Sequence, residues 1–154
     1  METARQAARG GKTLLIVEDD ILPAMALRDE LEDAGYRVLD LTVGVRDAIA
    51  VAMKDRPDLA LVNIELQGHD DGLPLAIELK AMGVPSLFIS GQAGRARSAK
   101  TVAIGSLPKP YRATDAVAAV DFLLRRLDGD GTAIAPPNLE VFDDAPDGLA
   151  PKAA

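Results

Sequence analysis

Short apolar runs alternate five times with stretches in which apolar residues recur every three or four positions. A nearly continuous apolar run is typical of a strand that is covered on both faces. Recurrence every three or four residues instead gives a helix a single apolar stripe. This alternation predicts an α/β fold, in which a doubly wound, five-stranded parallel sheet carries helices on both faces. The strands are expected at residues 13–17, 36–41, 59–62, 86–90 and 103–107.

The alternation occupies residues 12–128, and the sequence on either side differs in composition. Residues 1–11 combine charged and small residues without an apolar segment, so we expect a disordered leader. Residues 129–154 are rich in Gly, Pro, Asp and Ala and lack periodicity, which is typical of a tail. The apolar patch at residues 139–142 is either part of that tail or a short strand that adds to a sheet edge. In the second case the arm could also pair with a second copy, which predicts a homodimer as one alternative.

Composition limits the classes of function that the chain can have. The formal net charge is −7, which argues against a nucleic-acid-binding surface because phosphate contacts need clustered Lys and Arg. No apolar run approaches the roughly 18 residues that would span a bilayer, so no membrane association is expected. Cys is absent, which excludes disulfides and thiolate chemistry. We therefore expect a cytoplasmic protein.

Polar side chains follow four of the five predicted strands. Because the carboxyl ends of parallel strands meet at one rim of the sheet, these side chains are expected to lie together, where such folds bind their ligands. Carboxylates suit Mg²⁺, whereas a hydroxyl and an ammonium suit phosphoryl oxygens. The candidates, in chain order, are Glu18, Asp19, Asn63, Glu65, Ser90 and Lys109.

Five short motifs surround these candidates: Leu-Leu-Ile-Val-Glu-Asp-Asp at 14–20, Pro-Asp-Leu-Ala-Leu-Val-Asn at 57–63, Asp-Gly-Leu at 71–73, Ile-Ser-Gly at 89–91 and Leu-Pro-Lys-Pro at 107–110. Together they resemble the response-regulator receiver domain of two-component signalling, over about residues 12–127. The resemblance implies a flavodoxin-like receiver fold and a Mg²⁺ site. It also implies a Lys-Pro bond that is commonly cis, here Lys109-Pro110.

The roles of the candidate residues follow from the same resemblance. The Mg²⁺ ligands would be Glu18, Asp19, Asn63 and the backbone carbonyl of Glu65. Asn63 would take the phosphoacceptor position, Ser90 would supply the hydroxyl that contacts the phosphoryl group, and Lys109 would be the conserved lysine of the site. The Glu65 side chain is expected to point away from the site into solvent.

Three departures from the family pattern predict altered signalling. An amide cannot form an acyl phosphate, so Asn63 predicts no phosphorylation at this position and weaker Mg²⁺ binding. Ser106 stands where the family usually has Tyr or Phe, and the stretch from Ser90 to Lys109 is about one helical turn shorter than usual. Asn63 is either natural or an engineered replacement of a native Asp.

Simpler interpretations exist for several of these residues. The acidic run at 18–20 could simply be negative charge that the dipole of the following helix stabilises, with no metal involved. His69 is interpreted as a solvated loop residue, and Asp70 and Asp71 as helix-capping residues. Thr114 is expected to cap the last helix.

The best-supported function is a stand-alone receiver that is not an enzyme. It would act through protein contacts with a sensor histidine kinase, a phosphotransferase or another signalling protein. One alternative is an ordinary phosphoaccepting receiver with autophosphatase activity, if residue 63 is natively Asp. A remote alternative is a flavodoxin-like binder of a small ligand, although no glycine-rich phosphate loop follows the first strand.

Overall fold

A computed structural model describes residues 11–66 and 72–142 of the chain. Its strands form one sheet in the order β2-β1-β3-β4-β5-β6. The first five strands in the chain run parallel, as predicted, and the sixth pairs antiparallel with β5. The strand bounds are β1 Thr13–Val17, β2 Arg37–Val38, β3 Leu59–Asn63, β4 Ser86–Ser90, β5 Gly105–Pro108 and β6 Glu140–Val141.

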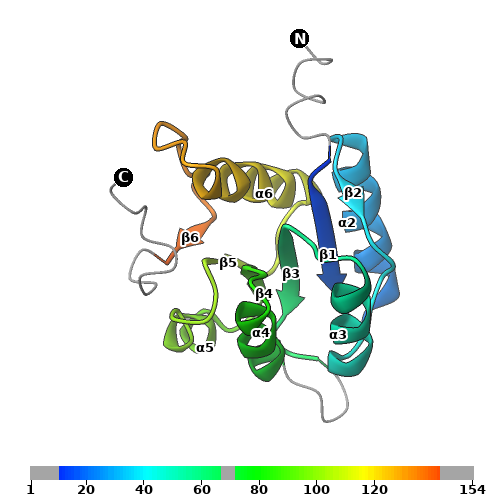
Figure 1. Ribbon diagram of the computed structural model, residues 1–154. Coiled ribbons are helices and arrows are strands. Elements are labelled where there is room, and N and C mark those ends of the chain that lie inside the picture. The colour runs from blue at the N-terminus through cyan, green and yellow to red at the C-terminus, as the bar shows by residue number, and fades with distance from the viewer. Residues whose placement is uncertain (1–10, 67–71, 143–154) are drawn as a thin grey trace.

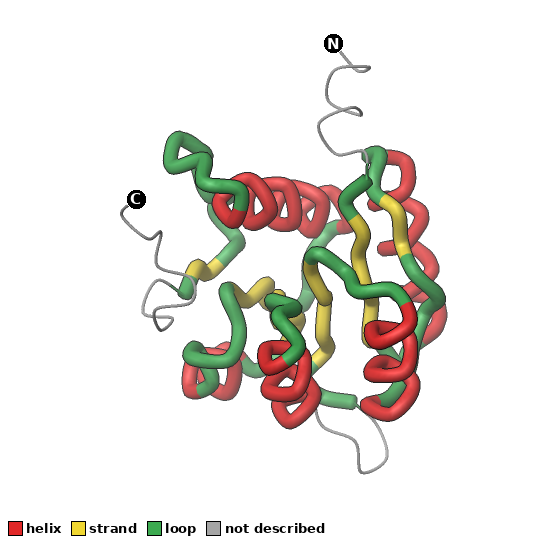
Figure 2. The backbone as a smooth tube through the Cα atoms, in the orientation of Figure 1, coloured by secondary structure: helices red, strands yellow, loops and turns green. Residues whose placement is uncertain are grey.

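The helices cover both faces of the sheet (Figures 1 and 2). Residues of α2 and α6 belong to one buried cluster, and residues of α3, α4 and α5 belong to the other. The predicted α/β doubly wound fold is therefore confirmed. The helix bounds are α2 Ile21–Asp33, α3 Val45–Lys54, α4 Gly72–Ala81, α5 Ala93–Ser98 and α6 Ala113–Leu127.

The core is almost entirely aliphatic. Every residue of β1, β3 and β4 is buried, because these strands lie between two helical layers. Phe88 is the largest of the fully buried side chains in the described part of the chain, and most of the others are Leu or Ile. Burial of this apolar surface, at roughly 25 cal/mol per Å², is the main force that holds the sheet between its two helical layers.

Three local predictions need correction. The second strand covers only Arg37–Val38, because its alternating pattern belongs to a sheet edge with one pairing partner. The fifth strand begins at Gly105 and not at residue 103. The last helix has its N-cap at Arg112, whose backbone N–H donates to the Asp115 carboxylate at 3.1 Å, so Thr114 lies inside the helix and does not cap it.

Residues 139–142 form the additional strand and its flanks, so the sheet in the described part of the chain has six strands, one more than predicted. The Phe142 N–H donates to the Ile104 carbonyl at 3.1 Å. Leu139 and Phe142 are buried in opposite core clusters, so the arm is anchored on both faces of the sheet. Arg97 of α5 forms an ion pair with Glu140 at 2.9 Å. Of the two interpretations of this patch, the edge strand is confirmed.

Exchange of this arm between two copies stays a prediction, because the arm pairs with β5 of its own chain. Residues 129–138 connect α6 to the arm, and an exchanged dimer would make the same strand contacts between chains. If exchange occurs, the full chain should show a concentration-dependent dimer in gel filtration, and a chain ending at Asp128 should elute only as a monomer. Identical oligomeric states for the two chains would exclude the arm as the dimer contact.

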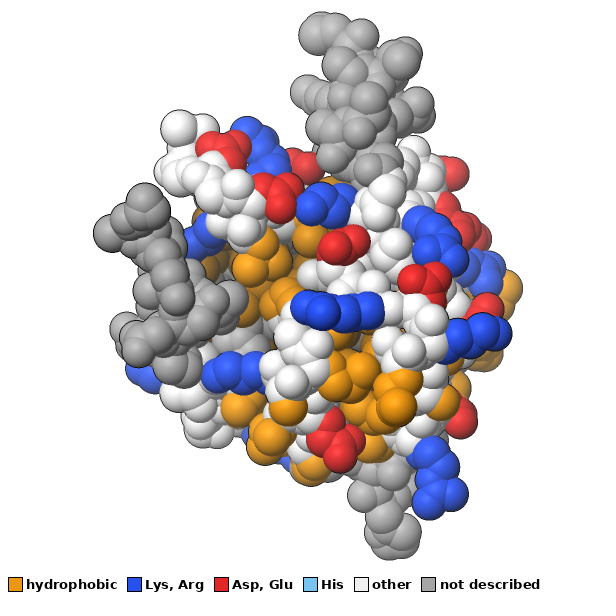
Figure 3. All heavy atoms as spheres, in the orientation of Figure 1, with side chains coloured by type: hydrophobic (Ala, Val, Ile, Leu, Met, Phe, Trp, Pro, Cys, Tyr) orange, Lys and Arg blue, Asp and Glu red, His pale blue; other side chains and the backbone are white. Residues whose placement is uncertain are grey.

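None of the helices in the described ranges is long and apolar enough to cross a bilayer. Apolar side chains gather on the surface over α3 and α4 (Figure 3). Each of these two helices has an exposed large apolar side chain: Met53 of α3 is 74% accessible and Ile77 of α4 is 55% accessible.

Candidate functional site

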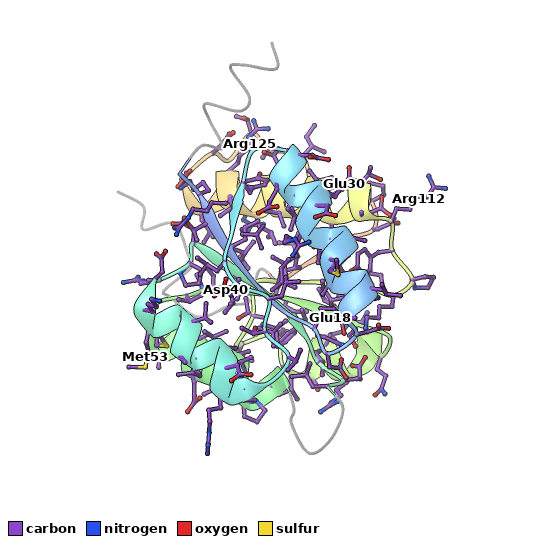
Figure 4. All side chains as sticks on the ribbon, turned by 90° about the vertical axis from the view of Figure 1, so that its right-hand side faces the viewer. Glu18, Glu30, Asp40, Met53, Arg112 and Arg125 are labelled. Atoms are coloured by element: carbon purple, nitrogen blue, oxygen red, sulfur yellow. The ribbon has the colours of Figure 1, made fainter. Side chains whose placement is uncertain are left out.

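Four strands end at the rim that carries the candidate residues. Glu18 and Asp19 follow β1, Asn63 is the last residue of β3, and Ser90 is the last residue of β4. Lys109 follows β5 directly, and the Lys109-Pro110 peptide bond is cis, as predicted. Figure 4 shows Glu18 between the end of β1 and the first turn of α2. The predicted convergence on one rim is therefore confirmed by geometry, whereas the chemical roles of the residues stay predictions.

The side-chain amide of Asn63 is the centre of the site. Its Nδ2 donates to Glu18 Oε2 at 2.9 Å and lies 3.4 Å from Asp19 Oδ1. Its Oδ1 accepts the backbone N–H of Glu65 at 3.1 Å. The reverse orientation would set the amide oxygen against two carboxylates and leave the Glu65 N–H facing an NH₂ group. Asn63 is only 3% exposed, so these hydrogen bonds largely replace water for the amide.

Glu18 is the most enclosed carboxylate of the site, with 7% of its surface exposed. Its Oε1 lies 3.5 Å from Lys109 Nζ, and its Oε2 accepts the backbone N–H of Asp20 at 3.1 Å in addition to the Asn63 amide. Its backbone N–H donates to the Thr42 carbonyl at 3.0 Å. A buried carboxylate needs such partners, because leaving it unpaired would cost several kcal/mol.

The donor set does not fit a divalent cation in this arrangement. Mg²⁺ requires oxygen ligands in near-octahedral geometry. Asn63 instead directs its NH₂ group at the oxygens of Glu18 and Asp19, and Lys109 neutralises the remaining Glu18 oxygen. Within residues 11–66 and 72–142, no group of three or more acidic, His or Cys side chains is placed to hold a metal ion. The amide and the ammonium together supply the positive partners that a cation would otherwise supply.

The Glu65 side chain does not point into solvent, so that prediction was wrong. Its Oε2 accepts the Ser90 hydroxyl at 2.7 Å, and its Oε1 accepts the Gly91 backbone N–H at 3.0 Å. The sequence places Glu65 two residues beyond a strand end but carries no signal for its direction, because a side chain in an irregular segment follows local backbone angles. The side chains of His69, Asp70 and Asp71 lie outside the described residues.

A pocket of about 520 Å³ opens beside Glu18 and Lys109 and is lined further by Pro110, Tyr111 and the first turns of α2. Sequence reasoning missed Tyr111. Burial, and then the negative charge of Glu18, raise the pKa of the Tyr111 phenol. The phenol therefore stays protonated at neutral pH and can serve the pocket as a hydrogen-bond donor.

Comparison with known proteins places this geometry in a family. The family model for the response regulator receiver domain matches residues 14–121. The phosphate regulon transcriptional regulatory protein PhoB of Pseudomonas aeruginosa is 30% identical over 133 residues, which is 82% of this chain and 57% of that protein. The transcriptional regulatory protein PdtaR of Mycobacterium tuberculosis is 25% identical over 121 residues, which is 75% of this chain and 58% of that protein. The chain thus spans little more than half the length of these relatives.

Solved structures show the same fold. The signal receiver domain of a modulated diguanylate cyclase from Desulfovibrio desulfuricans G20 is 36% identical with a TM-score of 0.66, over 74% of this chain and 94% of that chain. The receiver domain of NtrX from Brucella abortus is 27% identical with a TM-score of 0.68, over 73% of this chain and 98% of that chain. The sequence motifs, the sheet order and the family match agree: the chain belongs to the response regulator receiver domain family and is a module of two-component signalling.

Proposed function

We propose that this receiver conveys a signal through protein contacts and accepts no phosphoryl group at residue 63. The observation that supports the proposal is the Asn63 amide, whose Nδ2 is a hydrogen-bond donor to the acidic pair Glu18 and Asp19. Formation of an acyl phosphate needs a carboxylate oxygen to attack phosphorus. The Asn63 oxygen carries no charge and already accepts the Glu65 N–H.

The charge balance of the rim supports the same proposal. Glu18, Asp19 and Glu65 contribute three carboxylates, and Lys109 is the only ammonium among the candidate residues. A phosphoryl group that entered without a metal ion would meet net negative charge. In a partly buried site such repulsion costs several kcal/mol.

The partners that we propose are proteins of two-component pathways: a sensor histidine kinase, a phosphotransferase or another signalling protein. A receiver that docks on such a protein without taking its phosphoryl group would compete with phosphorylatable receivers for the same surface. The similarity to transcriptional regulators and to a diguanylate cyclase module indicates that related receivers serve several outputs.

The proposal predicts no phosphorylation by a small-molecule donor. After incubation with acetyl phosphate and Mg²⁺, the intact mass of the protein should be unchanged. The Asn63→Asp variant is the matched control, because it restores the nucleophile and keeps Ser90 and Lys109 in place. We expect a fraction of this variant to gain one phosphoryl group.

A phosphoryl group found on residue 63 of the unaltered chain, located by peptide mapping, would contradict the proposal. A phosphorylated Asn63→Asp variant would also show that the rest of the site is still competent. That result fits an ordinary receiver whose native Asp was replaced, as well as a natural chain that lost its acceptor.

A further inference from the structure

Two hydrogen-bond donors at the end of β4 converge on one carboxylate. The Ser90 hydroxyl donates to Glu65 Oε2 at 2.7 Å, and the Gly91 backbone N–H donates to Glu65 Oε1 at 3.0 Å. Each carboxylate oxygen therefore has its own donor. A hydroxyl and a backbone N–H that converge in this way form an anion site of the kind that binds carboxylates and phosphoryl oxygens.

The Ser90 hydroxyl depends on this anion. Ser90 has no exposed surface, so its hydroxyl must be paired within the protein. The hydroxyl has a single proton, and the Glu65 oxygen at 2.7 Å is a closer acceptor than the Gln92 carbonyl at 3.2 Å. The hydroxyl oxygen in turn accepts the Gln92 N–H at 2.8 Å. One carboxylate thus orders three consecutive residues that lead into α5.

Hydrogen bonds also connect Glu65 and the segment that it holds to the rest of the site. The Glu65 backbone N–H donates to Asn63 Oδ1 at 3.1 Å. This hydrogen bond fixes the position of the Glu65 backbone, from which the side chain extends. The Lys109 backbone N–H donates to the Ser90 carbonyl at 2.8 Å, which ties the end of β4 to the end of β5. The segment that Glu65 holds is therefore continuous with Asn63 on one side and with Lys109 on the other.

We infer that Glu65 is a built-in anionic ligand, which keeps the 90–92 segment and the start of α5 permanently in an anion-bound conformation. The inference rests on the proposed function, since an anion supplied by the chain itself replaces a phosphoryl group only if residue 63 carries none. The inference extends the proposed function to the regulation of that site. The surface beside α5 is presented to partners in one state, without a phosphorylation switch.

Amide hydrogen exchange, measured by NMR on the full chain, tests this inference. In the Glu65→Gln variant the amide keeps one acceptor oxygen but loses the charge and the second acceptor. We expect exchange at Gly91 to become at least about tenfold faster, which corresponds to roughly 1.4 kcal/mol. Glu78→Gln, which removes an exposed carboxylate from α4, is the matched control and should leave Gly91 unchanged.

Rescue by an added anion separates an anion site from simple packing. In the Glu65→Ala variant the two donors lose their carboxylate, and sodium acetate should slow Gly91 exchange again, whereas sodium chloride at the same ionic strength should not. Wild-type exchange rates at Gly91 in Glu65→Gln would overturn the inference, and so would acetate that acts no better than chloride. Phosphorylation of Asn63 is measured by the intact mass of the protein, whereas the role of Glu65 is measured by amide hydrogen exchange. A failure of the proposed function is therefore distinguishable from a failure of this inference.

Discussion

Replacing Asn63 by Asp is expected to lower the free energy of unfolding by about 3 kcal/mol in metal-free buffer at neutral pH, and Mg²⁺ should restore most of that loss. The variant loses the Nδ2 donor that pairs with Glu18 at 2.9 Å, and a hydrogen bond to a charged group contributes roughly 1.5 to 3 kcal/mol. It also places a third negative charge beside Glu18 and Asp19, of which Glu18 faces Lys109 at 3.5 Å.

Urea unfolding of both proteins, in EDTA and in Mg²⁺, measures this effect. Three carboxylates form a hard-oxygen site, so the variant should bind Mg²⁺ and gain stability from it, by about 2.7 kcal/mol when Mg²⁺ is at 100 times its dissociation constant. The unaltered protein should gain less than about 0.5 kcal/mol under the same conditions, because its amide and Lys109 already satisfy the acidic pair. Equal Mg²⁺ responses of the two proteins would show that Asn63 does not replace the cation.

The regular elements of the fold were predictable because buried apolar residues recur along the sequence with the periodicity of the strand or helix that carries them. The runs at 13–17 and 86–90 were predicted with the bounds that the structure has, since central parallel strands are apolar throughout. The second strand was predicted too long because an edge strand pairs over fewer residues than its alternating pattern suggests. The arm carries apolar residues that suit a strand, but nothing local specifies that its partner is β5, about 35 residues earlier in the chain.

The location of the site was predictable for a different reason, which is topology. Once the strands are parallel, their carboxyl ends meet, so Glu18, Asn63 and Lys109 had to approach one another. Their pairing was not predictable at the same level. That Asn63 donates to Glu18 depends on side-chain rotamers, and that Glu65 turns toward Ser90 depends on the backbone angles of the residues directly after β3. Sequence reasoning therefore identified the residues but had the wrong direction for Glu65.

Gly72→Ala is expected to destabilise the protein by about 2 to 3 kcal/mol, although alanine is the better helix former. A Cβ on Gly72 would lie 2.5 Å from the Asn63 carbonyl oxygen and 2.9 Å from the Ile64 Cα. Both are backbone atoms, so relief requires a shift of α4 against the end of β3. Inserting a methyl group into such a contact costs about 1 to 3 kcal/mol. Gly72 is the first residue of α4, where the higher helix propensity of alanine contributes little stability.

The clash is at the Asn63 backbone, so stability and site geometry should change together. Thermal unfolding should show a decrease in Tm of about 4 to 10 °C for a domain of this size. Gly94→Ala is the matched control, because a Cβ at this glycine of α5 meets nothing within 4 Å, and it should be neutral or slightly stabilising. Because the shift would move Asn63 against Glu18, the Asn63 side-chain amide resonances should also move in Gly72→Ala and stay in place in Gly94→Ala. Unchanged stability and resonances in Gly72→Ala would mean that α4 does not press against the end of β3 as the structure shows.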